Sequence, residues 1–191
     1  MTRIVAGSAK GRTLKVPAKG TRPTSERVRE ALFARLDNWG LVDGAVVLDL
    51  YAGSGALGLE ALSRGAAQAD LVEKSRPAAA LLAENVRSLG LPARVHVQDV
   101  RTFLASRGGA ALLGGQCGLV LVDPPYDVGE DELAAVLEAL GPWLTPDSLV
   151  AVERSTRSPE PTWPTHLKLE DRSTWGETAV WFAGPPLEAT S

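Results

Sequence analysis

The stretch VLVDPPY, residues 120–126, places an acid, two prolines and a tyrosine directly after a run of apolar residues. A residue that precedes proline is driven toward extended backbone, so we expect Asp123 to end a buried strand. Two successive prolines stiffen the turn, lack N–H groups and present carbonyl oxygens as acceptors. The motif can therefore accept hydrogen bonds from an amine, although a rigid strand-end turn that begins with Asp fits the same residues.

A second chemistry-bearing stretch is LDLYAGSGALGLEAL, residues 48–62. Its glycines, Gly53, Gly55 and Gly58, fit the G-x-G-x-x-G pattern between a predicted strand and a predicted helix. Glu73 ends the next predicted strand, where an acid suits ribose hydroxyls, so the pattern indicates a nucleoside-type cofactor. Asp49, four residues before the first glycine, repels a phosphate and attracts an ammonium group. These residues favour S-adenosylmethionine over a dinucleotide, and the absence of G-x-x-x-x-G-K-S/T removes the basis for an ATPase.

A third acid, Asp99, ends the stretch VHVQD and has two possible roles. At the end of a third strand it can accept a hydrogen bond from an adenine amino group. It can equally cap the helix that we expect to begin near Arg101.

These residues need a scaffold, and the chain from residue 45 onward alternates strand-like and helix-like segments. Strands are expected at 45–51, 69–75, 93–100, 118–126 and 147–155, and helices at 55–65, 77–90, 101–108 and 130–143. This alternation predicts an α/β fold with a parallel sheet covered by helices on both faces. Residues 166–184 indicate a hairpin around Gly176 that closes the sheet edge. Because ligands bind beyond the carboxyl ends of parallel strands, the acids named above are expected to meet there.

The amino-terminal segment differs from the rest of the chain in charge and pattern. Two short strands, Arg3–Ala6 and Arg12–Val16, precede a helix with an apolar stripe at Val28, Leu32 and Leu36 and a stop at Gly40. Residues 1–35 hold nine Lys and Arg against two Glu, a balance of +7, whereas the remainder carries −10. Such asymmetry suits a polyanion-binding arm, although a merely solvated basic arm fits it equally well.

Length and composition limit the remaining possibilities. At 191 residues the chain can bury one proper core, and its single cysteine excludes an internal disulfide. The absence of a Cys/His cluster predicts no metal site, and no stretch is apolar enough to span a membrane or act as a signal peptide. We therefore expect a soluble, cytoplasmic protein.

The combined motifs carry a family resemblance over residues 2 to 183. VDPPY resembles the D/N/S-P-P-Y/F/W signature of S-adenosylmethionine-dependent amino methyltransferases. With RIVAGSAKGRTLKVP, RPTSERVREALF and LDLYAGSGALGLEALSRGA, the chain is similar to the RsmD family of bacterial 16S ribosomal RNA guanine-N2 methyltransferases. The segment RPTSERVREALF distinguishes this family from other methyltransferases, because many of them share the sheet motifs.

The resemblance implies a Rossmann-like class I methyltransferase fold with a mostly parallel seven-stranded sheet. It implies a basic hairpin and helix extension at 1–40, a methyltransferase domain at 41–184 and a disordered tail at 185–191. The expected cofactor is S-adenosyl-L-methionine, which leaves as S-adenosyl-L-homocysteine, and its expected contacts are Asp49, Tyr51, Ala52, Gly53, Ser54, Gly55, Gly58, Glu73, Lys74, Asp99 and Val100.

The same resemblance implies the catalytic and RNA-binding residues. The catalytic motif is Asp123, Pro124, Pro125 and Tyr126, with Tyr126 stacking on the target base. The expected RNA contacts are Lys10, Arg12, Arg22, Thr24, Arg27 and Arg29. The expected partner is 16S ribosomal RNA or the small ribosomal subunit during assembly. The protein is expected to be a monomer that binds no metal and no membrane.

Two other functions remain open at this point. A DNA adenine-N6 methyltransferase uses the same tetrapeptide, but the chain has no sizeable second region for reading a DNA site. A ribosome-assembly protein that keeps the fold without catalysis is the other alternative, and intact Asp123 and glycine-loop residues count against it.

Overall fold

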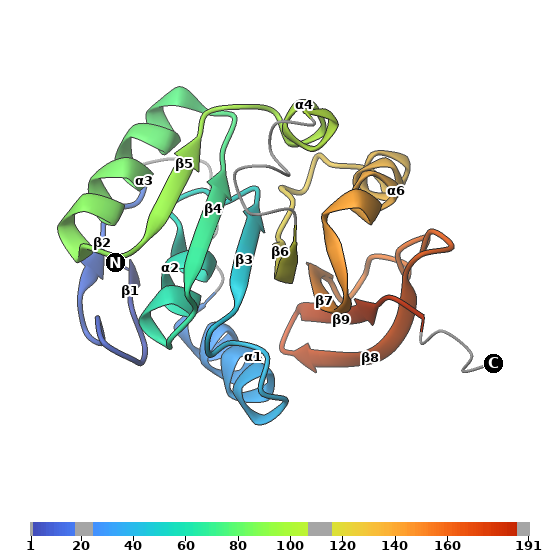
Figure 1. Cartoon of the computed structure of the whole chain (residues 1–191), viewed down its shortest axis with the longest axis horizontal. Coiled ribbons are helices and arrows are strands. Elements are labelled where there is room, and N and C mark those ends of the chain that lie inside the picture. Colours follow the sequence, from blue (N-terminus) through green and yellow to red (C-terminus); the bar gives the residue numbers. More distant parts are fainter. Residues whose placement is uncertain (1, 18–24, 107–115, 187–191) are drawn as a thin grey trace.

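The computed structural model describes residues 2–17, 25–106 and 116–186, and its centre is a seven-stranded sheet (Figure 1). The strand order is β5-β4-β3-β6-β7-β9-β8, in which only β9 runs opposite to the other strands and pairs antiparallel with both β7 and β8. A separate two-stranded antiparallel sheet joins β1 and β2 near the amino terminus. The strands are β1 Thr2–Arg3, β2 Thr13–Leu14, β3 Val46–Leu50, β4 Gln68–Val72, β5 Ala93–His96, β6 Cys117–Val122, β7 Leu144–Ser155, β8 Lys168–Trp175 and β9 Thr178–Gly184.

Helices cover both faces of the sheet and form two apolar layers. One layer joins α1, α2 and α3 to the side chains of one sheet face, including Val47, Leu119 and Phe182. The other joins α4 and α6, which lie side by side, to the opposite face through Leu48 and Val120. The helices are α1 Glu26–Asn38, α2 Ala56–Ser63, α3 Arg76–Leu89, α4 Val100–Ala105, α6 Glu130–Ala139 and a short 3-10 turn at Gly141–Trp143.

The predicted α/β fold is confirmed, and local signals explain the helix boundaries. The Ser25 hydroxyl accepts a hydrogen bond from the backbone N–H of Val28 at the start of α1. Gly90 ends α3 with φ +64, a left-handed conformation that glycine adopts without penalty. The expected hairpin around Gly176 is also present, with β9 inserted between β7 and the edge strand β8. The two amino-terminal strands are shorter than predicted, at two residues each.

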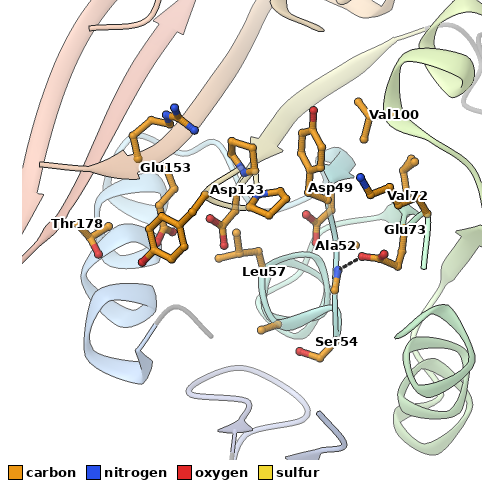
Figure 2. Close-up of a pocket in the computed structure, with 18 of the residues that line it drawn as sticks. Asp49, Ala52, Ser54, Leu57, Val72, Glu73, Val100, Asp123, Glu153 and Thr178 are labelled. Atoms are coloured by element: carbon orange, nitrogen blue, oxygen red, sulfur yellow. Dashed lines mark hydrogen bonds between the residues drawn. The ribbon is translucent and has the colours of Figure 1, made fainter. Parts of the chain in front are cut away.

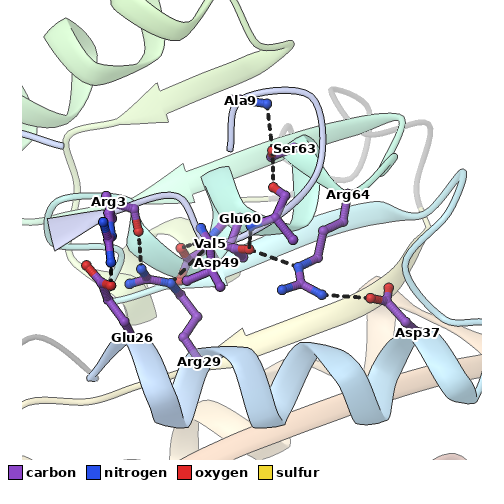
Figure 3. A network of polar contacts seen from close by, with 12 residues as sticks. Arg3, Val5, Ala9, Glu26, Arg29, Asp37, Asp49, Glu60, Ser63 and Arg64 are labelled. Atoms are coloured by element: carbon purple, nitrogen blue, oxygen red, sulfur yellow. Dashed lines mark hydrogen bonds and ion pairs between the residues drawn. The ribbon is translucent and has the colours of Figure 1, made fainter. Parts of the chain in front are cut away.

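The amino-terminal arm is attached to the main domain through a buried cluster of charges (Figure 3). Glu60 on α2 accepts hydrogen bonds from the backbone N–H groups of Val5 and Ala6, at 2.8 and 3.0 Å. Its carboxylate also lies 3.3 Å from Nε of Arg29 and 2.9 Å from Nε of Arg64. The charge of Glu60 therefore ties the arm and helix α1 to the helix that follows the glycine loop.

Arg29 corrects one of the RNA-binding predictions. Its side chain is completely buried, and it donates a hydrogen bond to the backbone oxygen of Arg3 while it faces Glu60. Burial lowers the pKa of Arg29, and the neighbouring carboxylate opposes that shift. A guanidinium in this position is not accessible to an RNA phosphate, so Arg29 has a structural role.

The described part of the chain lacks a membrane-spanning helix and a metal-binding cluster. No helix in the described ranges is long and apolar enough to cross a membrane. Among residues 2–17, 25–106 and 116–186, no group of three or more His, Cys, Asp or Glu side chains is placed to hold a metal ion. Residues 187–191 of the predicted tail lie outside the described part of the chain.

Candidate active site

A pocket of about 360 Å³ opens at the carboxyl ends of the parallel strands, where three of the predicted acids, Asp49, Glu73 and Asp123, line it (Figure 2). Twelve of the predicted cofactor and catalytic residues line it: Asp49, Tyr51, Ala52, Gly53, Ser54, Glu73, Lys74, Val100, Asp123, Pro124, Pro125 and Tyr126. Figure 2 shows Glu73 and Val100 toward one end, Thr178 and Glu153 toward the other, and Asp123 between them.

Glu73 holds the glycine loop in place. One of its carboxylate oxygens accepts a hydrogen bond from the backbone N–H of Gly53 at 2.9 Å, and the other accepts one from Ser75 at 2.7 Å. The loop turns through Gly53 and Gly55, which both have positive φ. Because Glu73 still lines the pocket, its remaining lone pairs suit the hydroxyls of a ribose.

Asp49 is a buried carboxylic acid with one unused oxygen. Its Oδ2 accepts a hydrogen bond from the backbone N–H of Gly58 at 2.9 Å, whereas its buried Oδ1 has no partner within the described chain. Desolvation raises the pKa of Asp49 to about 8, helped by the charges of Asp123 and Glu73, while the Gly58 N–H opposes the shift. An ammonium group would satisfy this acid. The ammonium group of S-adenosylmethionine is a donor that fits this unused acceptor.

The close approach of α2 to Asp49 makes Gly58 sensitive to substitution. A Cβ atom at this position would lie 2.3 Å from Cδ2 of Leu71 and 2.9 Å from Oδ2 of Asp49. We expect Gly58→Ala to destabilise the fold by about 1 to 3 kcal/mol and to weaken cofactor binding, as measured by urea unfolding and calorimetry. Gly118→Ala is the matched control, because its added Cβ meets nothing within 4 Å. Equal effects of both substitutions would contradict this packing argument.

Tyr51 bears backbone strain inside the same loop. It is the one non-glycine residue with positive φ in the described chain, at +64°. Such conformations are costly for residues with a Cβ and are concentrated at functional sites. Burial raises the pKa of Tyr51 to about 12, so its phenol stays protonated beside the pocket.

The DPPY turn lies beside the cofactor end of the pocket and opens toward solvent. Asp123 follows β6 directly, and the carbonyl oxygen of Pro125 accepts the N–H of Val128 at 3.0 Å, which fixes the turn. Tyr126 is 81% exposed although it is aromatic. An exposed ring at the mouth of a pocket is a stacking surface for a flat ligand.

Three predicted cofactor residues, Gly55, Gly58 and Asp99, do not line the pocket. Gly55 is the N-cap residue that precedes α2, and Gly58 packs on Asp49, so both shape the loop. Asp99 is exposed and accepts hydrogen bonds from the backbone N–H groups of Arg101 and Thr102. Asp99 therefore caps α4 through Oδ1, and its neighbour Val100 lines the pocket.

Sequence reasoning missed a second group of lining residues. They come from the arm, from α2, from β4 and from the β7–β9 region: Val16, Ala56, Leu57, Val72, Glu153, Arg154, Ser155, Ser158, Glu177 and Thr178. The ends of β7 and β9 meet the pocket because β7 pairs with both β6 and β9. The rule that ligands bind at strand ends points to Glu153, which lies near the end of the fifth predicted strand.

The predicted RNA-binding residues are only partly described. Lys10, Arg12 and Arg27 are exposed, although the Arg12 guanidinium also donates to the backbone oxygen of Ser88 at 2.8 Å. Arg27 lines a groove that continues from the pocket past Tyr126. The other two, Arg22 and Thr24, lie outside the described residues.

The sheet order, the glycine loop and the acids at the strand ends define a Rossmann-like class I methyltransferase. Comparison with solved structures supports this fold assignment. The chain superimposes on "Putative methyltransferase yhhF from Escherichia coli" with a TM-score of 0.81 and 35% identity, covering 96% of this chain and 97% of that one. A hypothetical protein of Thermus thermophilus gives a TM-score of 0.81 at 37% identity, with 95% and 98% coverage.

The sequence comparisons identify the family. The family model described as "Conserved hypothetical protein 95" matches residues 2–184. Ribosomal RNA small subunit methyltransferase D of Escherichia coli is 40% identical over 182 residues, which cover 93% of this chain and 86% of that protein. The putative rRNA methyltransferase YlbH of Bacillus subtilis is 34% identical, with 93% and 96% coverage. This chain belongs to the RsmD family.

Proposed function

We propose that this protein methylates the exocyclic N2 amine of a guanine in 16S ribosomal RNA, with S-adenosylmethionine as cofactor and the assembling small subunit as substrate. The observation that carries the proposal is the pocket shared by Asp49, Glu73 and the DPPY turn. The 40% identity to a protein named ribosomal RNA small subunit methyltransferase D supports the choice of RNA.

Asp123 and the Pro124 carbonyl are proposed to make the target amine a better nucleophile. The lone pair of a purine amine is delocalised into the ring, which makes the nitrogen a poor nucleophile. When Asp123 and the Pro124 carbonyl each accept one N–H, the nitrogen becomes more tetrahedral and its lone pair points along the pocket. The Asp123 carboxylate also stabilises the developing positive charge and accepts the departing proton or passes it to water.

The residues of the pocket act mainly by binding the cofactor and the target base and by orienting them toward each other. Bound S-adenosylmethionine supplies an electrophilic methyl group on a sulfonium. Glu73 accepts hydrogen bonds from the ribose hydroxyls, and Asp49 receives the ammonium group. Tyr126 stacks on a target base that has left its helical stack, which brings the amine within reach of Asp123.

Cofactor affinity is expected to depend on pH through Asp49. In the free protein its pKa is raised to about 8, so the carboxyl is mostly protonated at pH 7. An ammonium ligand favours the ionised form, so binding releases a proton and affinity rises by up to about tenfold per unit from about pH 6 to about pH 8. Calorimetry in buffers of different ionisation enthalpy measures both effects. Asp49→Asn is expected to bind weakly with no proton release, and a pH-independent affinity in the unsubstituted protein would contradict the assignment.

The basic arm is proposed to contact RNA phosphates. Because each phosphate contact releases counterions, the double variant Lys10→Ala/Arg27→Ala is expected to bind RNA more weakly and to lower the salt slope of log K by about 1.5. Lys168→Ala is the control, since Lys168 is exposed at the end of β8 away from the pocket. Binding without salt dependence would contradict the proposed phosphate contacts of the arm. Equal salt slopes for the unsubstituted protein, the double variant and Lys168→Ala would contradict them as well.

The substrate class is tested by offering labelled S-adenosylmethionine with three acceptors in parallel. These are small subunits from cells that lack the protein, the naked 16S RNA and duplex DNA. Label in either RNA sample supports the proposal. Label in DNA alone supports the adenine-N6 alternative, and no label in any sample supports a silent binding protein.

A further inference from the structure

The end of the pocket beyond Asp123 holds a second carboxylate, Glu153. Val122 of β6 pairs with Val152 of β7 in parallel register. The residues that follow them, Asp123 and Glu153, therefore lie opposite each other. Side chains alternate between the faces of a sheet, and register partners share a face, so the two acids point to the same side. Asp49 pairs with Leu121 and therefore faces this side as well.

Glu153 also marks the point where the pocket continues into a groove. It lines both the pocket and the groove, as do Tyr126 and Thr178. Figure 2 shows Glu153 between Asp123 and Thr178, on the opposite side of Asp123 from the cofactor residues. A base that stacks on Tyr126 and offers its N2 amine to Asp123 can place its N1 side next to Glu153.

We propose that Glu153 selects guanine by accepting its N1–H, a step that rests on the proposed guanine-N2 function. Adjacent strands lie about 4.8 Å apart, which lets two carboxylates address neighbouring N–H groups of one base. A carboxylate only accepts hydrogen bonds. It therefore binds the N1–H of guanine and repels the N1 lone pair of adenine or 2-aminopurine.

The test uses 2-aminopurine, which keeps the N2 amine of guanine but has an acceptor at N1 and no O6. The full-length protein is assayed on two RNAs that carry guanine or 2-aminopurine at the position it labels. A lost hydrogen bond to a charged group predicts that the unsubstituted protein prefers guanine by about 10- to 100-fold in kcat/KM. Glu153→Gln presents both a donor and an acceptor, so its preference is expected to fall to within about threefold. Calorimetry is expected to show unchanged cofactor affinity.

Glu138→Gln makes the same chemical change on the exposed part of helix α6 and is expected to keep the full preference. If Glu153→Gln lowers both rates by the same factor, Glu153 has only a structural role and the inference is overturned. If the unsubstituted protein methylates guanine but does not discriminate against 2-aminopurine, the inference fails while the proposed function stands. If it labels no guanine, both fail.

Discussion

The Asp123→Ala protein is expected to bind S-adenosylmethionine normally and to transfer methyl groups about a thousandfold more slowly. The carboxylate is the group proposed to accept the N–H of the target amine and to stabilise its developing charge, and such groups contribute about 10² to 10⁴ in rate. Single-turnover transfer to small subunits measures the chemical step. Calorimetry measures cofactor affinity, which is not weakened because the charge of Asp123 raises the pKa of Asp49 and its removal favours the ionised form of that acid.

Asp127 offers a matched control for this experiment. It is an exposed carboxylate four residues further along the chain and does not line the pocket. Asp127→Ala is expected to keep nearly full activity. A rate for Asp123→Ala within about tenfold of the unsubstituted protein would show that the DPPY acid is not the catalytic group.

The largest loss of stability is expected from Glu60→Ala. This substitution removes the acceptor of two backbone N–H groups in the arm and leaves the buried Arg29 guanidinium without its carboxylate. Breaking a buried ion pair in this way costs about 3 to 5 kcal/mol. In a domain of this size that corresponds to a fall of about 10 °C in Tm. Urea unfolding and calorimetric melting measure the two quantities.

Two further variants test whether the buried cluster is the cause. Glu84→Ala removes an exposed partner of Lys15, also between the arm and the main domain, and is expected to leave Tm close to its original value. Arg29→Met is expected to cost less than Glu60→Ala, because Glu60 keeps the N–H groups of Val5, Ala6 and Arg64. Equal melting temperatures for Glu60→Ala and Glu84→Ala would refute the role of the cluster.

The pocket could be predicted where its residues follow local rules. Asp49, Glu73 and Asp123 all fall within the last four residues of predicted strands, and a parallel sheet brings such ends to one edge. The alternation of strands and helices was sufficient to predict that sheet. Positive-φ glycines and helix caps then fixed the loop that carries Gly53.

The predictions failed or fell short where a role depends on distant pairing. Arg29 lies off the apolar stripe of its helix, yet Glu60, thirty-one residues away, provides a buried partner that no local pattern reveals. Asp99 is different, because its helix-cap role follows from a local pattern and uses only Oδ1, which accepts the backbone N–H groups of Arg101 and Thr102. Glu153 enters the site through the register of β7 against β6, which depends on strand pairing across the sheet.

The most direct test of guanine-N2 methylation is the identity of the methylated nucleoside. Small subunits from cells that lack this protein are incubated with it and with labelled S-adenosylmethionine, and the 16S RNA is digested to nucleosides. We predict a single labelled product, N2-methylguanosine, that disappears with Asp123→Ala. Label in any other nucleoside, or N2-methylguanosine that persists with Asp123→Ala, would contradict the account.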